Sequence, residues 1–336
     1  MLLEITQRIL DNEDISFEDM HSALGAILQG ECETVPIAGF LTALAAKGET
    51  AEEVAGMAQA MRDHAVAVNP KSKDIIDIVG TGGDGRSTFN ISTTTAIVVA
   101  GCGVKVAKHG NRAITSKCGS ADILAQLGVK IDAAPETIAR CIDEANIGFM
   151  FAPAHHPAMK YVQPIRKELG FRTVFNVLGP LSNPARVPFQ FTGVAKPELI
   201  SVMAEALKRL GLKRAMVVHC DGMDELTTSA PAKIAQLVEG NITEETVNAS
   251  NFGLASASEA DIRGGSLEDN ERITRSIING SDTSPRRGVV LFNAAGALMV
   301  AGTVKDFTEG IAIAQQSITS GNAQKSLDLF VEISNS

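Results

Sequence analysis

The sequence contains no tryptophan, a single tyrosine and only 4% aromatic residues, so aliphatic and alanine side chains must supply most of its core. Its five cysteines are odd in number, widely spaced and without any CxxC pair. This pattern fits neither a disulfide framework nor a zinc site, and it favours a reducing cytoplasm.

Long apolar runs and a targeting signal are also missing from the sequence. No apolar stretch approaches the roughly 20 residues of a membrane span, and the acidic, amphipathic N-terminus lacks the features of a secretory signal. Basic residues are in the minority, because 30 Lys and Arg face 39 Asp and Glu, a net charge of −9. The composition therefore argues against nucleic acid or a membrane as a partner, and an anionic ligand needs a local basic pocket.

A chain of 336 residues exceeds the size at which one hydrophobic core stops growing, so we expect two domains. Residues 1–70 contain only helical patterns. Two helix starts carry N-cap signals, namely Ser16 with Asp19 three residues later, and a capping box of Thr50 and Glu53. We therefore predict a small helical domain over residues 1–70.

Residues 71–336 alternate between short β-branched runs and helical stretches. The strand candidates are DIIDIV, VKVAKHG, GFMFA, FQFTGVA and RAMVVHC, and the chain after about residue 267 is mostly helical. This alternation predicts a larger α/β domain whose mostly parallel central sheet is covered on both faces. The segment from about residue 156 to 185 interrupts the rhythm, and we expect part of it to pack onto the helical domain.

The stretch GTGGDG, residues 80–85, matches the dinucleotide pattern GxGxxG and nearly matches the P-loop pattern. The dinucleotide interpretation lacks the carboxylate expected about 20 residues later, because the next strand ends in Lys108 and His109. The P-loop interpretation fails because Arg86 replaces the lysine, and Asp84 inside the loop would repel a bare phosphate. The loop is either a purely structural turn or the holder of a metal-bound pyrophosphate or a polyol.

Polar and basic residues follow this loop in two places. NISTTT sets Asn90, Ser92 and Thr93 at the start of the next helix, where free N–H groups and the helix dipole favour a phosphate. KHGNRAITSKCGS, residues 108–120, gathers four potential cations with several hydroxyl groups. The two segments suit a multiply phosphorylated ligand, although plain helix caps and a solvated basic loop also account for them.

Two further segments carry charge. Asp224 and Glu225 are adjacent carboxylates after an apolar strand, and Mg²⁺ is commonly bound by two carboxylates with phosphate oxygens and water. Near a proline-rich turn, His155 and His156 precede Arg166, whose guanidinium suits a carboxylate ligand. A solvated acidic turn and a histidine pair with a packing role are the alternatives.

The chain resembles the anthranilate phosphoribosyltransferase family of tryptophan biosynthesis over almost its whole length. Four blocks carry this resemblance: GTGGDGRSTFNIST, KHGNRAITSKCGSAD, HHPAMKYVQPIRKELGFRTVFNVLGPLSNPA and DGMDELTTSAP. The resemblance implies a nucleoside-phosphorylase-like phosphoribosyltransferase fold that pairs as a homodimer through its helical domain. It implies a pentosyltransferase that moves the phosphoribosyl group of 5-phosphoribosyl 1-pyrophosphate to the amine of anthranilate, with Mg²⁺ as cofactor.

The same resemblance assigns roles to individual residues. The pyrophosphate contacts it implies are Gly80, Gly83, Asp84 and Thr88. The implied contacts to the 5-phosphate end are Asn90, Ile91, Ser92 and Thr93. Further implied substrate contacts are Lys108, His109, Asn111, Ser116 and Ser120.

The resemblance also implies a metal site and an aromatic-substrate site. The implied magnesium ligands are Ser92, Asp224 and Glu225, and the positions around anthranilate are Gly80, Asn111, His156 and Arg166. Lys108, Asp84 and Arg166 are the implied catalytic residues. Arg86 and Cys118 receive no role.

Two other functions compete with this prediction. A nucleoside phosphorylase of the same fold has no need for the Asp224–Glu225 pair. A nucleic-acid-binding relative would show a basic groove and a degraded acidic pair, whereas this chain is acidic and keeps both carboxylates.

Overall fold

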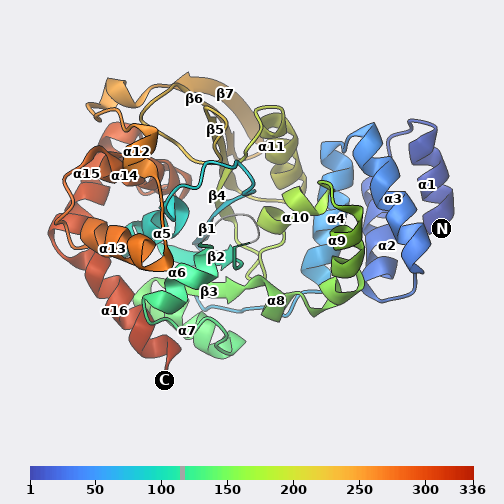
Figure 1. Cartoon of the computed structure of the whole chain (residues 1–336), viewed down its shortest axis with the longest axis horizontal. Coiled ribbons are helices and arrows are strands. Elements are labelled where there is room, and N and C mark those ends of the chain that lie inside the picture. The colour runs from blue at the N-terminus through green and yellow to red at the C-terminus, as the bar shows by residue number, and fades with distance from the viewer. Residues whose placement is uncertain (114–117) are drawn as a thin grey trace.

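The computed structural model describes residues 1–113 and 118–336, which form two lobes of unequal size (Figure 1). The smaller lobe holds the N-terminal helices, and the larger lobe holds a seven-stranded sheet and the C-terminus. The small helical domain and the larger α/β domain are as expected from the sequence.

Helices from two distant parts of the chain build the smaller lobe. Its hydrophobic core contains side chains of the first four helices together with Val162, Ile165, Phe175 and Leu178. A segment that follows the third strand therefore returns to the helical domain. The helices concerned are α1 (Leu2–Leu10), α2 (Phe17–Leu28), α3 (Thr34–Lys47), α4 (Ala51–Asp63), the 3-10 helix η1 (Pro157–Tyr161), α9 (Gln163–Leu169) and α10 (Phe175–Leu181). The short helix α8 (Ala152–His155) lies against the third strand and leads into η1.

The helix starts predicted in this domain are confirmed. The Ser16 side chain accepts a hydrogen bond from the Asp19 N–H, and Thr50 and Glu53 form the reciprocal capping box. Glu53 is fully buried, and its carboxylate also accepts from the Ile15 N–H at 2.9 Å. The capping carboxylate therefore ties the start of α4 to the loop between α1 and α2.

The sheet of the larger lobe has the strand order β3-β2-β1-β4-β5-β6-β7. Its first five strands pair in parallel, as the sequence predicts, and the last two add an antiparallel hairpin that was not expected. The carboxyl ends of the parallel strands therefore meet at one edge. The strands are β1 (Ile75–Gly80), β2 (Lys105–Gly110), β3 (Ile147–Phe151), β4 (Phe189–Gly193), β5 (Arg214–Cys220), β6 (Ala232–Val238) and β7 (Asn241–Val247).

Helices cover both faces of the sheet (Figure 1). No described helix is long and apolar enough to cross a membrane. The remaining helices are α5 (Ile91–Gly101), α6 (Ser120–Gln126), α7 (Pro135–Ala145), α11 (Leu199–Arg209), η2 (Ala249–Phe252), α12 (Glu259–Ile262), α13 (Leu267–Ile278), α14 (Pro285–Val300), α15 (Phe307–Thr319) and α16 (Asn322–Ser334).

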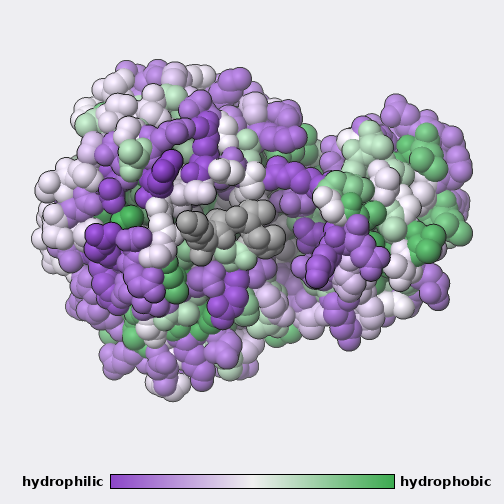
Figure 2. Space-filling view, viewed as in Figure 1, coloured by the Kyte–Doolittle hydropathy of each residue, from purple (hydrophilic) through white to green (hydrophobic). Residues whose placement is uncertain are grey.

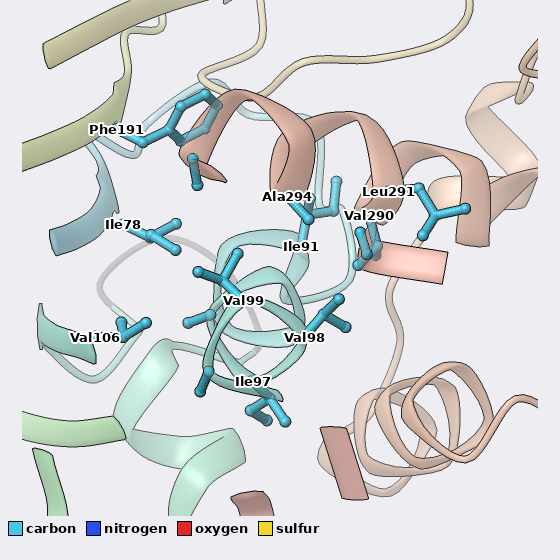
Figure 3. Close-up of a cluster of buried hydrophobic side chains, with 14 of the residues drawn as sticks. Ile78, Ile91, Ile97, Val98, Val99, Val106, Phe191, Val290, Leu291 and Ala294 are labelled. Atoms are coloured by element: carbon cyan, nitrogen blue, oxygen red, sulfur yellow. The ribbon is translucent and has the colours of Figure 1, made fainter. Parts of the chain in front are cut away.

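Alternate residues of β5 serve two different cores, because successive side chains of a strand point to opposite faces. Met216 and Val218 belong to the core beneath α5 and α14, where Figure 3 shows aliphatic side chains of the sheet and both helices converging. Ala215 and Val217 belong to the core shared by α11 and the helical domain. The core shared by α11 and the helical domain joins the two lobes, so this face of the sheet is held close to the helical domain.

Candidate active site

Three segments that are distant in sequence meet at the carboxyl edge of the sheet. They are the glycine-rich loop after β1 (residues 81–89), the end of β2, and the acidic turn after β5 (residues 221–226). The Gly82 N–H donates to the Asp224 carboxylate at 2.6 Å. A Cβ atom on Gly193 would lie 1.6 Å from the Asp224 carbonyl oxygen, so only glycine at the end of β4 lets the acidic turn approach this closely.

Lys108 is the buried cation of this edge, with a side chain only 2% exposed. Its Nζ atom donates to the Ile78 carbonyl at 2.6 Å and to the Ser92 hydroxyl at 3.2 Å. Burial lowers the pKa of Lys108, while the nearby carboxylates of Asp77 and Glu225 oppose that shift. The ammonium group thus connects the sheet to the start of α5 beside the acidic turn.

The carboxylates of the acidic turn crowd one another. Burial, and next the charge of Asp84, raise the pKa of Asp224 to about 6. Burial and then the charge of Asp224 raise the pKa of Glu225 well above its ordinary value, although Lys108 counteracts this. A bound cation would relieve this repulsion, so the acidic turn fits Mg²⁺, which commonly uses one or two carboxylates with substrate phosphates and waters. No cluster of three or more His, Cys, Asp or Glu suited to a metal occurs within residues 1–113 and 118–336.

The glycine-rich loop is shaped by positive φ angles at Gly82, Gly83 and Gly85, and at Ser87. Its second half is fixed, because Thr88 forms a bridge with Arg263 in an antiparallel arrangement. A cavity of about 480 Å³ opens beside this half of the loop, between it and the segment around α12.

Arg86, which occupies the position of a P-loop lysine, is bound by other groups. Its guanidinium makes an ion pair with Glu259 and donates to the Asp221 carbonyl at 2.7 Å. These contacts fasten the loop to α12 and to the acidic turn. Arg86 received no role from the sequence, and the structure gives it an anchoring one.

The start of α5 presents unpaired polar side-chain atoms among the residues of NIST. The Asn90 amide donates to the Cys118 carbonyl at 3.1 Å. The Asn90 Oδ1 and Thr93 Oγ1 atoms are buried with no hydrogen-bond partner among the described residues. Ile91 is the first residue of the helix, and its N–H donates to the Phe89 carbonyl at 2.7 Å. The helix dipole still favours an anion at this end of α5.

The cationic appearance of residues 108–120 is reduced in the structure. Arg112 forms an ion pair with Asp122 at 2.8 Å, and His109 is buried. Ser120 lies at the start of α6, where its hydroxyl donates to the Asn111 carbonyl at 3.1 Å. The predicted contact Ser116 lies outside the described residues.

A second cavity, of about 560 Å³, lies between the two domains. Parts of α4, α8, η1, α9 and α10 line it together with the ends of β1 and β2. It brings together five residues that the sequence predicts around the substrates: Gly80, His109, Asn111, His156 and Arg166. We call this space the interdomain cavity.

Two histidines of the interdomain cavity are neutral. The rings of His109 and His156 lie 5.1 Å apart between centroids. Burial lowers the pKa of His156 to about 4, with a smaller contribution from His155, and burial lowers the pKa of His109 even more clearly. Both Nε2 atoms are buried without a partner in the described part of the chain. The cavity therefore offers unused polar atoms without positive charge from its histidines.

Arg166 supplies positive charge to the same cavity, which Lys160 also lines. Its guanidinium lies 5.3 Å from the ring centroid of Phe175, and burial lowers its pKa. Among the residues described, no carboxylate forms an ion pair with Arg166. A half-buried and uncompensated arginine is suited to an anionic ligand, and a carboxylate matches its fork of donors.

Sequence reasoning missed one arginine that touches the loop. Arg172 donates to the Gly83 carbonyl at 2.9 Å across 89 positions of sequence. No periodicity or motif marks this contact, because it depends on the return of α9 and α10 to the helical domain. GFRT lies inside the third block that carries the family resemblance, but its letters indicate only a charge and not this contact.

Comparison with known proteins gives one consistent result. The family described as "Glycosyl transferase family, a/b domain" matches residues 72–324, and "Glycosyl transferase family, helical bundle domain" matches residues 3–65. The anthranilate phosphoribosyltransferase of Herpetosiphon aurantiacus is 48% identical over 329 residues, which cover 97% of each chain. That of Desulfatibacillum aliphaticivorans is 45% identical, covering 99% of this chain and 98% of the relative.

Solved structures agree with the sequence relatives. The anthranilate phosphoribosyltransferase of Thermus thermophilus has a TM-score of 0.94 at 39% identity and covers 98% of this chain and 99% of its own. The Saccharomyces cerevisiae enzyme in complex with PRPP and Mg has a TM-score of 0.91 at 32% identity, covering 99% and 98%. A further yeast structure, in complex with 4-fluoroanthranilate, has a TM-score of 0.89 at 31% identity and the same coverage.

The neutral histidines predict acid sensitivity of the fold. The folded pKa of His156, about 4, lies below its ordinary value of 6.5, so the unfolded chain takes up a proton first as the pH falls. The stability present above pH 6.5 is then lost between about pH 6.5 and 4. We expect His156→Gln to make the free energy of unfolding fall less steeply between pH 7.5 and 5 in urea denaturation, with His109 retaining part of the slope.

The control for this measurement is His21→Gln, a half-exposed histidine of the helical domain that pairs with Asp63 at 2.9 Å. Its pH slope should not become shallower. Equal slopes for the wild type and His156→Gln would contradict the assignment of a neutral, buried His156.

Proposed function

The chain belongs to the anthranilate phosphoribosyltransferase family, and from this premise we propose how its site performs the reaction. The protein transfers the phosphoribosyl group of 5-phosphoribosyl 1-pyrophosphate to the amine of anthranilate, a step of tryptophan biosynthesis. One observation carries this function. Arg166, which has no acidic partner among the described residues, lines the same interdomain cavity as Gly80 and Asn111. Lys108 and the acidic turn lie beside this cavity, at the carboxyl edge of the sheet. Nucleoside phosphorolysis and nucleic-acid binding do not account for this combination.

The phosphorylated substrate is held by the glycine-rich loop and the start of α5. Gly80, Gly83, Asp84 and Thr88 contact its pyrophosphate in this proposal. The start of α5 takes the 5-phosphate, because the helix dipole favours an anion there and the buried Asn90 and Thr93 side-chain oxygens have no partner among the described residues. The residues assigned there are Asn90, Ile91, Ser92 and Thr93, with Lys108, His109, Asn111, Ser116 and Ser120 nearby.

Ser92, Asp224 and Glu225 are the residues that would hold Mg²⁺. Bound there, the ion supplies positive charge to the pyrophosphate leaving group and lowers the cost of its departure. Lys108 acts at the same edge, because its buried ammonium is positioned before the reaction begins. Asp84 lies next to Asp224, and its negative charge adds to the charge that a bound cation would balance.

Arg166 binds the carboxylate of anthranilate and so orients the ring in the interdomain cavity. The aryl amine is neutral at pH 7, and the histidines that line the cavity are neutral as well, so these histidines neither repel Arg166 nor protonate the nucleophile. In the reaction the new N–C1 bond forms as the C1–O bond to pyrophosphate breaks, and the amine loses one proton. Positioning of the two substrates supplies much of the rate, and no covalent nucleophile is required.

The activity is tested by the loss of anthranilate fluorescence when the protein meets phosphoribosyl pyrophosphate and Mg²⁺. We expect turnover, and we expect Arg166→Ala to raise the KM for anthranilate about tenfold or more, because one charge-assisted interaction is lost. The KM for phosphoribosyl pyrophosphate should change little. Lys167→Ala, an exposed neighbour on α9, is the control. An unchanged KM for anthranilate in Arg166→Ala would refute the role of Arg166.

The metal assignment is tested by thermal unfolding. Mg²⁺ should raise the Tm of the wild type, because a ligand that binds only the folded state stabilises it. Asp224→Asn combined with Glu225→Gln should remove this shift, because the carboxylates that would hold the ion are gone.

A matched control pair for the metal test lies on β7, where Glu244 and Glu245 are adjacent and exposed. Glu244→Gln with Glu245→Gln should keep the full Mg²⁺ shift. A normal Mg²⁺ shift in the Asp224–Glu225 double variant would contradict the metal site.

The helical domain is the proposed dimer interface. It exposes large apolar side chains, among them Val35 at 81%, Leu3 at 69% and Leu10 at 64%. Figure 2 shows apolar surface on this lobe. Leu3 and Leu10 are seven residues apart on α1, so they lie on the same face of the helix and suit a partner helix.

Charge placed on this apolar surface should prevent pairing. We expect Leu10→Glu combined with Val35→Glu to be monomeric by size-exclusion chromatography with light scattering, whereas the wild type is a dimer. Val238→Glu, at an exposed apolar position of β6, should leave the dimer intact. A wild-type monomer, or a dimeric double variant, would rule out this interface.

The cytoplasm is the proposed compartment. All five cysteines lie in the described residues and none forms a disulfide. Three of these thiols are buried, which fits a reducing environment.

A further inference from the structure

Arg172 reaches the glycine-rich loop from the other domain. It lies in the connection between α9 and α10, and its Nη2 atom donates to the carbonyls of Gly83 at 2.9 Å and Gly82 at 3.4 Å. A Cβ on Gly83 would lie 1.8 Å from the same Nη2 atom. The guanidinium therefore packs directly on the loop backbone, and glycine is required at residue 83 for this contact.

The base of Arg172 is anchored in the helical domain. Val174 and Phe175, two and three positions after Arg172, are buried in the core that also contains α1 to α4. The Thr173 N–H donates to the Asn176 side chain at 3.1 Å, which fixes the turn at the start of α10. Arg172 is thus a contact from the helical side of the interdomain space to the loop.

The charge of Arg172 is not neutralised. Over the described part of the chain, no Asp or Glu forms an ion pair with Arg172, and the groups that accept its hydrogen bonds there are two neutral carbonyls. Arg86, on the same loop, has the opposite environment, since Glu259 and Asp221 both pair with it. A guanidinium has five N–H donors, and those carbonyls engage a single nitrogen of Arg172, so it retains donors and full charge for an anion.

We propose that Arg172 is a further binding residue for the pyrophosphate of the substrate, acting from the helical domain. The inference rests on the proposed function, which puts pyrophosphate at Gly83 and Asp84. The carbonyl contacts hold the guanidinium against the loop, and its remaining N–H groups bind the anion next to Asp84. The helical domain thereby contributes a cation to the leaving group in addition to the buried Lys108 of the α/β domain.

The test is the binding of inorganic pyrophosphate with Mg²⁺ to the full-length protein, measured by calorimetry in the absence of anthranilate. Arg172→Gln removes the charge and keeps an amide donor, and Arg172→Lys keeps the charge. We expect Arg172→Gln to weaken pyrophosphate binding about tenfold, as for the loss of a charge-assisted contact. On a logarithmic scale, Arg172→Lys should weaken pyrophosphate binding by less than half as much as Arg172→Gln does. Lys167→Gln, an exposed cation five residues earlier, should bind as the wild type.

A second readout separates charge from loop packing. Binding to the wild type should weaken more steeply with added salt than binding to Arg172→Gln, because one charge pair is missing in the variant. The proposal would be overturned if Arg172→Gln bound pyrophosphate with the affinity of the wild type. It would also be overturned if Arg172→Gln and Arg172→Lys lost the same affinity and showed the same salt dependence. A wild-type protein that binds no pyrophosphate would overturn it as well.

These outcomes are distinct from a failure of the proposed function. A protein that binds pyrophosphate through Arg172 but consumes no anthranilate would refute the reaction and support the binding residue. A protein that consumes anthranilate with pyrophosphate affinity independent of Arg172 would do the reverse.

Discussion

A buried ammonium group sets the arrangement of the whole site. Lys108 is almost fully enclosed, and an unpaired charge in that position would cost several kcal/mol. Its partners come from separate parts of the chain: the Ile78 carbonyl and the charge of Asp77 on β1, the Ser92 hydroxyl on α5 and the charge of Glu225 after β5. The requirement to compensate one lysine therefore holds β1, the start of α5 and the acidic turn at a common edge.

The compensation of charge is incomplete at this edge. Gly193 lets the backbone of Asp224 pack on the end of β4, and the Gly82 N–H holds its carboxylate. Held in this way, the carboxylates stay close together, and their pKa values rise because burial, and next their mutual repulsion, disfavour the charged forms. Functional sites often retain such destabilising arrangements, because a ligand that relieves the repulsion binds more tightly by the free energy that is released.

Local sequence patterns predicted the elements whose signals are local. The capping box of Thr50 and Glu53 starts α4 as predicted, and the β-branched runs form the five parallel strands. The hairpin of β6 and β7 was missed because β7, NITEETV, is exposed along most of its length and carries no apolar alternation. Its two-residue turn at Glu239 and Gly240 has positive φ at both positions, which is a type of turn that Asn-Gly signals more clearly than Glu-Gly.

The candidate site shows why counting charges in a segment is not enough. Residues 108–120 read as a cationic loop, yet Asp122 neutralises Arg112 and burial keeps His109 neutral. Arg86 is likewise satisfied by Glu259, 173 positions away, whereas Arg166 has no such partner among the described residues. Contacts between residues that are far apart in the sequence decide which cations remain without an acidic partner and can bind a ligand. A single sequence does not reveal these contacts. Recognition of a doubly anionic sugar and of a carboxylate therefore depends on which arginines and lysines the fold leaves uncompensated, more than on how many the chain contains.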